Sequence, residues 1–218
     1  MIRVVILDVG GVILYSNPLD PEQGALNRQR MAQKWGFDSV KHWKGGFYGS
    51  PNWKDCKVGK MTLMQMLKLG YPDWADDEQK LMDMMEDYRS ELQLHPELQR
   101  IIERLHALPH VRVFVLSNHE DTLMSLLEDK APQVIPLIEH IFNSYDIGFS
   151  KPDPRSFQTV LDTYQLTPEH CLFVDDKQSN IDAAKGLGID GFCYENNPEE
   201  LWTYMEGVLA AEDQKDEN

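Results

Sequence analysis

The sequence predicts an α/β fold in which a doubly wound, Rossmann-like parallel sheet carries an inserted α-helical cap. Short apolar runs rich in β-branched residues recur along the chain, and amphipathic helical segments separate them. This alternation is typical of a parallel sheet whose strands are joined by right-handed crossovers. Between residues 16 and 93, by contrast, no strand-like run occurs. We therefore expect residues 1–15 and 94–218 to form the core, and residues 16–93 to form the cap domain.

Length and charge limit the classes of partner. A chain of 218 residues can bury one core and a small second unit. Its formal net charge of −15 repels nucleic-acid phosphates and anionic membranes, so we expect neither as a partner. Three widely spaced cysteines favour free thiols over a disulfide framework, and no stretch approaches the length of a transmembrane helix. We expect a cytoplasmic protein that is a monomer or a weak homodimer.

An acidic residue directly follows the first predicted strand. Residues 4–7, Val-Val-Ile-Leu, are apolar without interruption, which predicts a strand buried on both faces. Asp8 follows at once, and after it come Gly10, Gly11 and a second apolar run at 12–14. An acid at this end of a buried strand lies where ligands bind in open α/β sheets. The alternative is that Asp8 only forms an Asx turn.

The insertion has a helical pattern. We expect three helices, over residues 28–35, 60–68 and 76–92, the first two ended by Gly36 and Gly70. A loop at 42–53, rich in Gly, Lys and aromatic residues, joins the first two helices and is the region expected to set specificity. The Met and Trp residues of the insertion are more typical of core packing than of a ligand site.

After residue 95, strands and helices alternate. The expected strands are residues 111–116, 141–142, 171–174 and 191–194. The expected helices are residues 97–108, 120–130, 155–164, 180–187 and 198–209. The charged tail, residues 212–218, has a composition typical of disorder.

Three of the predicted buried strands end in polar residues: Asp8, the pair Ser117-Asn118, and the pair Asp175-Asp176. Lys151 lies in a Ser-Lys-Pro-Asp-Pro loop between the last two. Each piece has an ordinary explanation as a helix cap or a surface turn. Together they are much harder to explain in that way, because the carboxyl ends of parallel strands meet at one edge of the sheet.

The residues at this edge are of the types that bind and react with a phosphate ester. Carboxylates packed closely repel one another, and their pKa values rise unless a cation lies between them. Oxygen ligands of this kind suit Mg²⁺, which also shares a substrate phosphate. Ser117, Lys151 and backbone N–H groups can hold the remaining phosphate oxygens. One aspartate is then available as a nucleophile toward phosphorus.

Four motifs, in this order along the chain, resemble those of the haloacid dehalogenase-like hydrolase superfamily, in the subfamily with an α-helical (C1) cap. They are Leu-Asp-Val-Gly-Gly-Val at 7–12, Leu-Ser-Asn at 116–118, Lys-Pro-Asp-Pro at 151–154 and Phe-Val-Asp-Asp at 173–176. Within that superfamily the chain is similar to bacterial sugar-phosphate phosphatases of the α-glucose-1-phosphate phosphatase type.

The resemblance implies roles for the polar residues at the strand ends. Asp8 is expected to attack phosphorus and to bind Mg²⁺. Ser117 is expected to hydrogen-bond the phosphoryl group, with Asn118 beside it, and Lys151 to neutralise nucleophile and phosphate. The apolar turn at 12–14 and the preceding glycines are expected to sense closure of the cap.

The resemblance also implies a metal site. The backbone carbonyl of Gly10 is expected to join Asp8 as a ligand. Asp176 is expected to bind Mg²⁺ directly, and Asp175 either directly or through water.

One position departs from the family pattern. Gly10 stands where the phosphatases of the family usually carry a second aspartate as general acid and base, a contribution of about 10²–10⁴-fold in rate. One explanation is that water or a cap-side residue takes over this role, the candidates being Tyr15, Asp20 and His42. Alternatively, the substrate has a leaving group that needs little protonation, or the protein binds phosphate without turnover.

We therefore expect a Mg²⁺-dependent phosphomonoester hydrolase that acts on a small phosphorylated metabolite. The non-enzyme alternative is a phosphate-binding or regulatory module whose cap is a docking face. The other enzymatic alternative is a 2-haloacid dehalogenase. It would use Asp8 on carbon without a metal, and the paired acids Asp175-Asp176 would then have no evident purpose.

Overall fold

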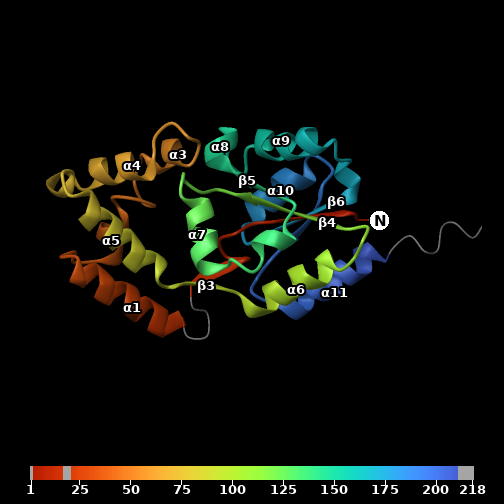
Figure 1. Cartoon of the computed structure of the whole chain (residues 1–218), viewed down its shortest axis with the longest axis horizontal. Coiled ribbons are helices and arrows are strands. Elements are labelled where there is room, and N and C mark those ends of the chain that lie inside the picture. The colour runs from red at the N-terminus through yellow and green to blue at the C-terminus, as the bar shows by residue number, and fades with distance from the viewer. Residues whose placement is uncertain (1, 17–20, 211–218) are drawn as a thin grey trace, which may run out of the picture.

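The computed structural model describes residues 2–16 and 21–210. Asp20 and the tail at 212–218, both named above, lie outside the described residues. Figure 1 shows the helices of the insertion gathered at one end of the molecule and the sheet with its covering helices at the other.

The core of the described chain is a five-stranded parallel sheet with strand order β5-β4-β1-β6-β7. The strands are β1 (Val4–Leu7), β4 (Arg112–Ser117), β5 (His140–Asn143), β6 (Cys171–Asp175) and β7 (Asp190–Cys193). The predicted fold class is confirmed, and so are the five predicted strands of the sheet, to within one or two residues at their ends. Because β1 lies between β4 and β6, the three strands with polar ends are neighbours.

Each face of the sheet carries its own apolar layer. Val5 and Leu7 pack with α6 (Pro96–His106), α7 (Leu123–Lys130) and α11 (Pro198–Leu209) on one side. On the other side, Val4 and Ile6 pack with α9 (Pro154–Tyr164) and α10 (Gln178–Lys185). Successive side chains of a strand point to opposite faces. A strand covered on both faces is therefore apolar at every position, which explains the unbroken run in β1.

The insertion has a separate core. Its helices are α1 (Pro21–Lys34), α2 (Val40–Lys44), α3 (Trp53–Cys56), α4 (Leu63–Gly70), the 3₁₀ turn η1 (Pro72–Trp74) and α5 (Glu78–Arg89). Buried Trp43, Met66, Met84 and Met85 belong to this core, which confirms that these Met and Trp residues serve packing. Helix α4 begins later than predicted because Thr62 and Gln65 form a capping box at its start.

The expectation that residues 16–93 contain no strand is wrong at both ends of the insertion. β2 (Leu14–Ser16) and β3 (Leu92–Leu94) form an antiparallel pair that connects the insertion to the core. Each strand has only three residues, too few to show an alternating pattern, and its partner lies far away in the sequence. The predicted end of the helix at 76–92 is also wrong, because the short strand β3 could not be recognised in the sequence. Helix α5 ends at Arg89 and the chain turns into β3.

Short helices occur in segments that were expected to be loops. Helices α2 and α3 include residues of the 42–53 loop, and α8 (Ser144–Ile147) lies in the segment 144–154, which the sequence also predicts to be a loop. Helix α7 starts at Leu123, three residues after the predicted start, because a turn at residues 121–122 precedes it. Within residues 2–16 and 21–210, no helix has both the length and the apolar character needed to cross a membrane. The division into core and cap domains remains a prediction.

Candidate active site

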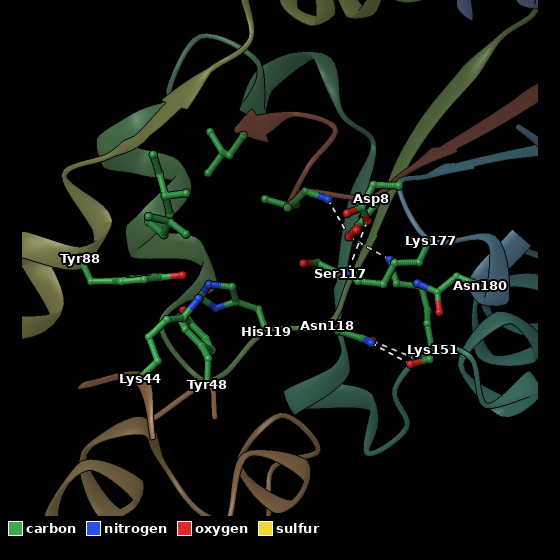
Figure 2. A pocket seen from close by; sticks show the side chains of 16 residues that line it. Asp8, Lys44, Tyr48, Tyr88, Ser117, Asn118, His119, Lys151, Lys177 and Asn180 are labelled. Atoms are coloured by element: carbon green, nitrogen blue, oxygen red, sulfur yellow. Dashed lines mark hydrogen bonds and ion pairs between the residues drawn. The ribbon is translucent and has the colours of Figure 1, made fainter. Parts of the chain in front are cut away.

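The carboxyl edge of the sheet gathers the predicted side chains in one place. Strands β4, β1 and β6 lie side by side, and the register pairs Leu7 with both Val115 and Val174. Residues that follow these strands therefore lie at the same level. Carboxylate oxygens of Asp8, Asp175 and Asp176 lie within 4.8 Å of one another. Figure 2 shows Asp8 and Ser117 on the same side of a cavity, with Lys151 close by.

Lys151 links two of the three aspartates. Its buried Nζ lies 2.8 Å from Oδ1 of Asp8 and 2.8 Å from Oδ2 of Asp175, and it donates to the carbonyl of Leu116 at 2.6 Å. Asn118 fixes the backbone that carries this lysine: Nδ2 donates to the Lys151 carbonyl at 2.8 Å, and Oδ1 accepts from the Lys151 N–H at 2.9 Å. Asn118 therefore positions Lys151 in addition to lining the cavity.

The two adjacent aspartates have different surroundings. Asp175 is fully buried and accepts hydrogen bonds from Lys151, from Asn180 Nδ2 at 2.9 Å and from the Lys177 N–H at 2.8 Å. Asp176 is exposed toward the cavity and contacts Lys177 Nζ at 3.3 Å. Asp175 is thus held in place by protein groups, whereas Asp176 is free to take a ligand.

The glycines after Asp8 permit this close arrangement. Gly11 has a φ of +85°, and a Cβ there would lie 2.8 Å from the Asp176 carboxyl group. Only glycine fits that position without moving Asp176. A Cβ on Gly10 would meet nothing within 4 Å, so space exists at the position where the family usually has an acid.

Asp8 is a desolvated carboxyl group. It is 5% exposed, and one oxygen accepts from the Val9 N–H at 2.7 Å. Burial raises its pKa to about 6; the charge of Lys151 opposes this rise and the charge of Asp175 adds to it. A carboxylate in this state gains from a further positive charge nearby.

The donor set fits a magnesium ion. Asp8, Asp175 and Asp176 offer only hard oxygen ligands, and the Gly10 backbone borders the same cavity. Mg²⁺ binds to one or two carboxylates and keeps other positions for water and substrate phosphate. The three facing carboxylates, with Asp8 desolvated, are the arrangement that such an ion would stabilise.

The opposite wall of the cavity, which has a volume of about 470 Å³, comes largely from the insertion. Lys44 ends α2, Tyr48 follows it in the 42–53 loop, and Tyr88 lies on α5. Figure 2 shows these three side chains across the cavity from Asp8, with His119 pointing toward them. Sequence reasoning singled out the loop but missed Tyr88 and His119. The position of His119 directly after Ser117-Asn118 was the available signal.

Lys44 differs from the other lysines of the cavity. Lys151 and Lys177 contact aspartates, whereas in the described part of the chain no carboxylate lies within 4 Å of the Lys44 ammonium group. Lys44 Nζ instead lies 5.2 Å from the ring centre of Tyr88. Its charge is available to a ligand in the cavity.

Neither of the two described candidates for a replacement acid lines this cavity. His42 pairs with Asp38 at 3.0 Å on the outer surface of the insertion. The Tyr15 ring packs on His95, with ring centres 4.9 Å apart. The third candidate, Asp20, lies outside the described residues. The turn at 12–14, expected to sense closure, is buried in the core, and Leu14 continues into β2.

Residues 2–188 match the model of the haloacid dehalogenase-like hydrolase family. The chain is 24% identical over 144 residues to flavin mononucleotide hydrolase 1 of Arabidopsis thaliana, across 66% of this chain and 57% of that protein. It is 32% identical over 89 residues to D-ribitol-5-phosphate phosphatase of Bacteroides thetaiotaomicron, across 38% of this chain and 43% of that protein. The matches therefore span less than two thirds of the length of these curated relatives.

The fold is also that of a solved enzyme of the same family. A crystal structure of a Bacteroides thetaiotaomicron enzyme, in complex with magnesium and inorganic phosphate, superimposes with a TM-score of 0.72 at 20% identity. The superposition covers 94% of this chain and 99% of that chain.

Proposed function

Because this chain belongs to the haloacid dehalogenase-like hydrolase family, we propose that it hydrolyses the phosphate monoesters of small metabolites with Mg²⁺ and with Asp8 as nucleophile. The observation that carries this proposal is the position of Asp8. Its carboxyl group lies 2.8 Å from Lys151 Nζ, faces Asp175 and Asp176, and borders the same cavity as Ser117.

The residues divide the work of phosphoryl transfer. An Asp8 oxygen forms a bond to phosphorus while the ester P–O bond breaks, and water then releases phosphate and restores Asp8. Lys151 keeps Asp8 ionised and offsets charge on the phosphoryl oxygens, to which the Ser117 hydroxyl donates a hydrogen bond. Asp8, Asp175, Asp176 and the Gly10 carbonyl would hold Mg²⁺, which supplies further stabilisation of phosphoryl charge when bound.

The substrate class follows from the cavity and from the relatives. The insertion closes the wall opposite Asp8 and acts as a cap that limits both the size of the substrate and the entry of water. Two relatives are named for flavin mononucleotide and D-ribitol 5-phosphate, which are small organic phosphates. The finer assignment to sugar phosphates of the α-glucose-1-phosphate phosphatase type is part of the same proposal.

Phosphate release from a panel of monoesters, with and without Mg²⁺, tests the proposal. The panel contains p-nitrophenyl phosphate, acetyl phosphate, sugar phosphates and nucleotides. Release that depends on Mg²⁺ and is lost in Asp8→Asn supports the phosphatase. Silence across the panel while inorganic phosphate still binds would favour the phosphate-binding module. Halide release from 2-chloropropionate without added metal would favour the dehalogenase.

A further inference from the structure

Because Gly10 is not an acid, the source of the proton for the leaving group is not accounted for. When an alkyl phosphate is cleaved, the departing alkoxide must receive a proton, and a positioned side chain speeds that step by about 10²–10⁴-fold. On the basis of the proposed function, we propose that His119 supplies this proton and later takes one from the attacking water. His119, whose ring points toward the side of the cavity away from Asp8, then takes the place of the acid that is missing at Gly10.

His119 is held by a buried carboxylate. Its Nδ1 lies 2.6 Å from Oε2 of Glu120, whose side chain is fully buried. A carboxylate this close to one ring nitrogen, together with the Glu120 backbone carbonyl 3.4 Å from the same nitrogen, restricts the orientation of the imidazole. Nε2 is then the nitrogen left for the cavity, and it has no hydrogen-bond partner among the residues that the structure describes.

A second ion pair fixes Glu120 in turn. Arg89 of α5 donates from Nη2 to Oε1 of Glu120 at 2.6 Å, and Thr122 donates to the same oxygen at 3.1 Å. The Arg89 side chain is 4% exposed. Arg89 and Glu120 are therefore positioning residues, and the insertion takes part in setting the orientation of His119.

His119 also lies on the correct side of the cavity. In phosphoryl transfer the attacking and leaving oxygens are roughly in line with phosphorus between them. Figure 2 shows Asp8 on one wall and the His119 ring directed toward the other, near the side chains of the insertion. A phosphoryl group seated at Asp8 and Ser117 therefore directs its leaving group toward the side of the cavity to which the His119 ring points.

Tyr48, Lys151 and Asp176 also border the cavity but are less suitable as this acid. Burial and the charge of Glu120 raise the pKa of Tyr48 well above its ordinary value, which makes it a poor acid near neutral pH. Lys151 is engaged by three oxygens, and Asp176 belongs to the carboxylate cluster. Histidine is the residue type that ordinarily changes its charge near neutral pH.

The two steps balance. In the first, the bond from Asp8 to phosphorus forms, the ester P–O bond breaks, and the Nε2 proton passes to the leaving oxygen. In the second, water forms a bond to phosphorus, the bond to Asp8 breaks, and a water proton returns to Nε2. The sum is ester plus water to alcohol plus phosphate, with His119 unchanged.

Leaving-group dependence tests this role. p-Nitrophenolate leaves without a proton, whereas the alkoxide of glycerol 3-phosphate needs one. His119→Gln is expected to lower kcat/KM for glycerol 3-phosphate by about 10²–10⁴-fold and that for p-nitrophenyl phosphate by less than about tenfold. Adding Gly10→Asp, for which space exists, is expected to restore at least about tenfold of the lost alkyl activity. His42→Gln, the same change outside the cavity, is the matched control and should alter neither rate.

An equal loss for both esters in folded His119→Gln overturns the role of His119. If that variant does not fold, the test is the rate at which the unsubstituted protein hydrolyses a series of aryl and alkyl phosphates. A nearly flat dependence on leaving-group basicity supports a bound acid, and a steep dependence contradicts it. Release of phosphate from no ester at all, with the unsubstituted protein and Mg²⁺, contradicts the proposed function itself, and the role of His119 falls with it.

Discussion

Arg89 of the insertion and Glu120 of the core form a buried ion pair, with Nη2 and Oε1 2.6 Å apart and the side chains 4% and 0% exposed. Arg89 ends α5, and Glu120 lies in the segment between β4 and α7. The pair therefore joins the insertion to the carboxyl edge of the sheet at the residue that also holds His119. Packing of the insertion and geometry of the site are coupled through these two charges.

Removing one member of this pair should be costly. Arg89→Met leaves the buried Glu120 carboxylate with less compensation, and we expect a loss of about 3–5 kcal/mol in the free energy of unfolding. Urea unfolding followed by circular dichroism measures this loss. Arg100→Met, which breaks an exposed pair with Glu97, is the control and should cost no more than about 1 kcal/mol. Equal effects of the two substitutions would contradict the coupling.

Glu120 should also make stability depend on acid pH. Burial alone would raise its pKa, but the charge and hydrogen bond of His119 and the charge of Arg89 outweigh burial and lower the pKa to about 2. The stabilisation is thus present above the unfolded-state pKa and is lost as the pH falls toward 2. The stability difference between the unsubstituted protein and Glu120→Gln should shrink by about 2 kcal/mol from pH 6 to pH 3. A difference that stays constant would show that Glu120 does not titrate as expected.

In protein treated with a chelator, ionisation of Asp8 should lower the free energy of unfolding, whereas ionisation of Glu120 raises it. Burial raises its pKa from 3.8 to about 6, so its ionisation destabilises the metal-free fold as the pH rises through this window. Asp8→Asn should abolish turnover and yet raise the free energy of unfolding by about 1–3 kcal/mol at pH 8. At pH 4 or below the gain should vanish, because Asp8 is then protonated. Urea unfolding of both proteins at both pH values measures this gain in stability. A gain that is independent of pH would show that it does not come from the ionisation of Asp8.

Asp176 should govern the response to magnesium. It faces the cavity with little engagement by protein groups, so Asp176→Asn should raise the Mg²⁺ concentration that gives half-maximal activity. Asp182→Asn is the matched control, because Asp182 lies on α10 and accepts a hydrogen bond from Gln178 without lining the cavity. A magnesium titration that is unchanged in Asp176→Asn would overturn the assignment of this residue as a ligand.

Lys44 should favour substrates with a second anionic group. Its ammonium group borders the cavity without a carboxylate nearby in the described chain. 3-Phosphoglycerate carries a carboxylate at the end where glycerol 3-phosphate carries an alcohol. The value of kcat/KM should therefore be higher for 3-phosphoglycerate. Lys44→Met should reduce that preference by about tenfold or more, the value of one charged hydrogen bond. Lys41→Met, on the same helix but outside the cavity, is the control; equal losses for both esters in Lys44→Met would exclude this role.

The sequence by itself determined the parallel sheet and the group of residues at its edge. Strands buried on both faces are apolar at every position, so β1, β4 and β6 could be recognised locally, together with the polar residues that follow them. Because parallel strands present their carboxyl ends at one edge, the pattern alone was enough to place Asp8, Ser117 and Asp175 together. The missing acid at Gly10 was indicated separately, by the resemblance to the haloacid dehalogenase-like family, whose phosphatases usually carry an aspartate at this position.

Only the tertiary structure decided what faces that edge. The β2–β3 pair, the wall formed by Lys44 and Tyr88, and the contact of Arg89 with Glu120 join segments that are distant in the sequence. No periodic pattern encodes such contacts, because each depends on how the insertion packs against the core. His119 was visible in the sequence as a residue beside a motif. Its pairing with a buried carboxylate, and its direction into the cavity, arise from packing that brings Glu120, Arg89 and the insertion around it.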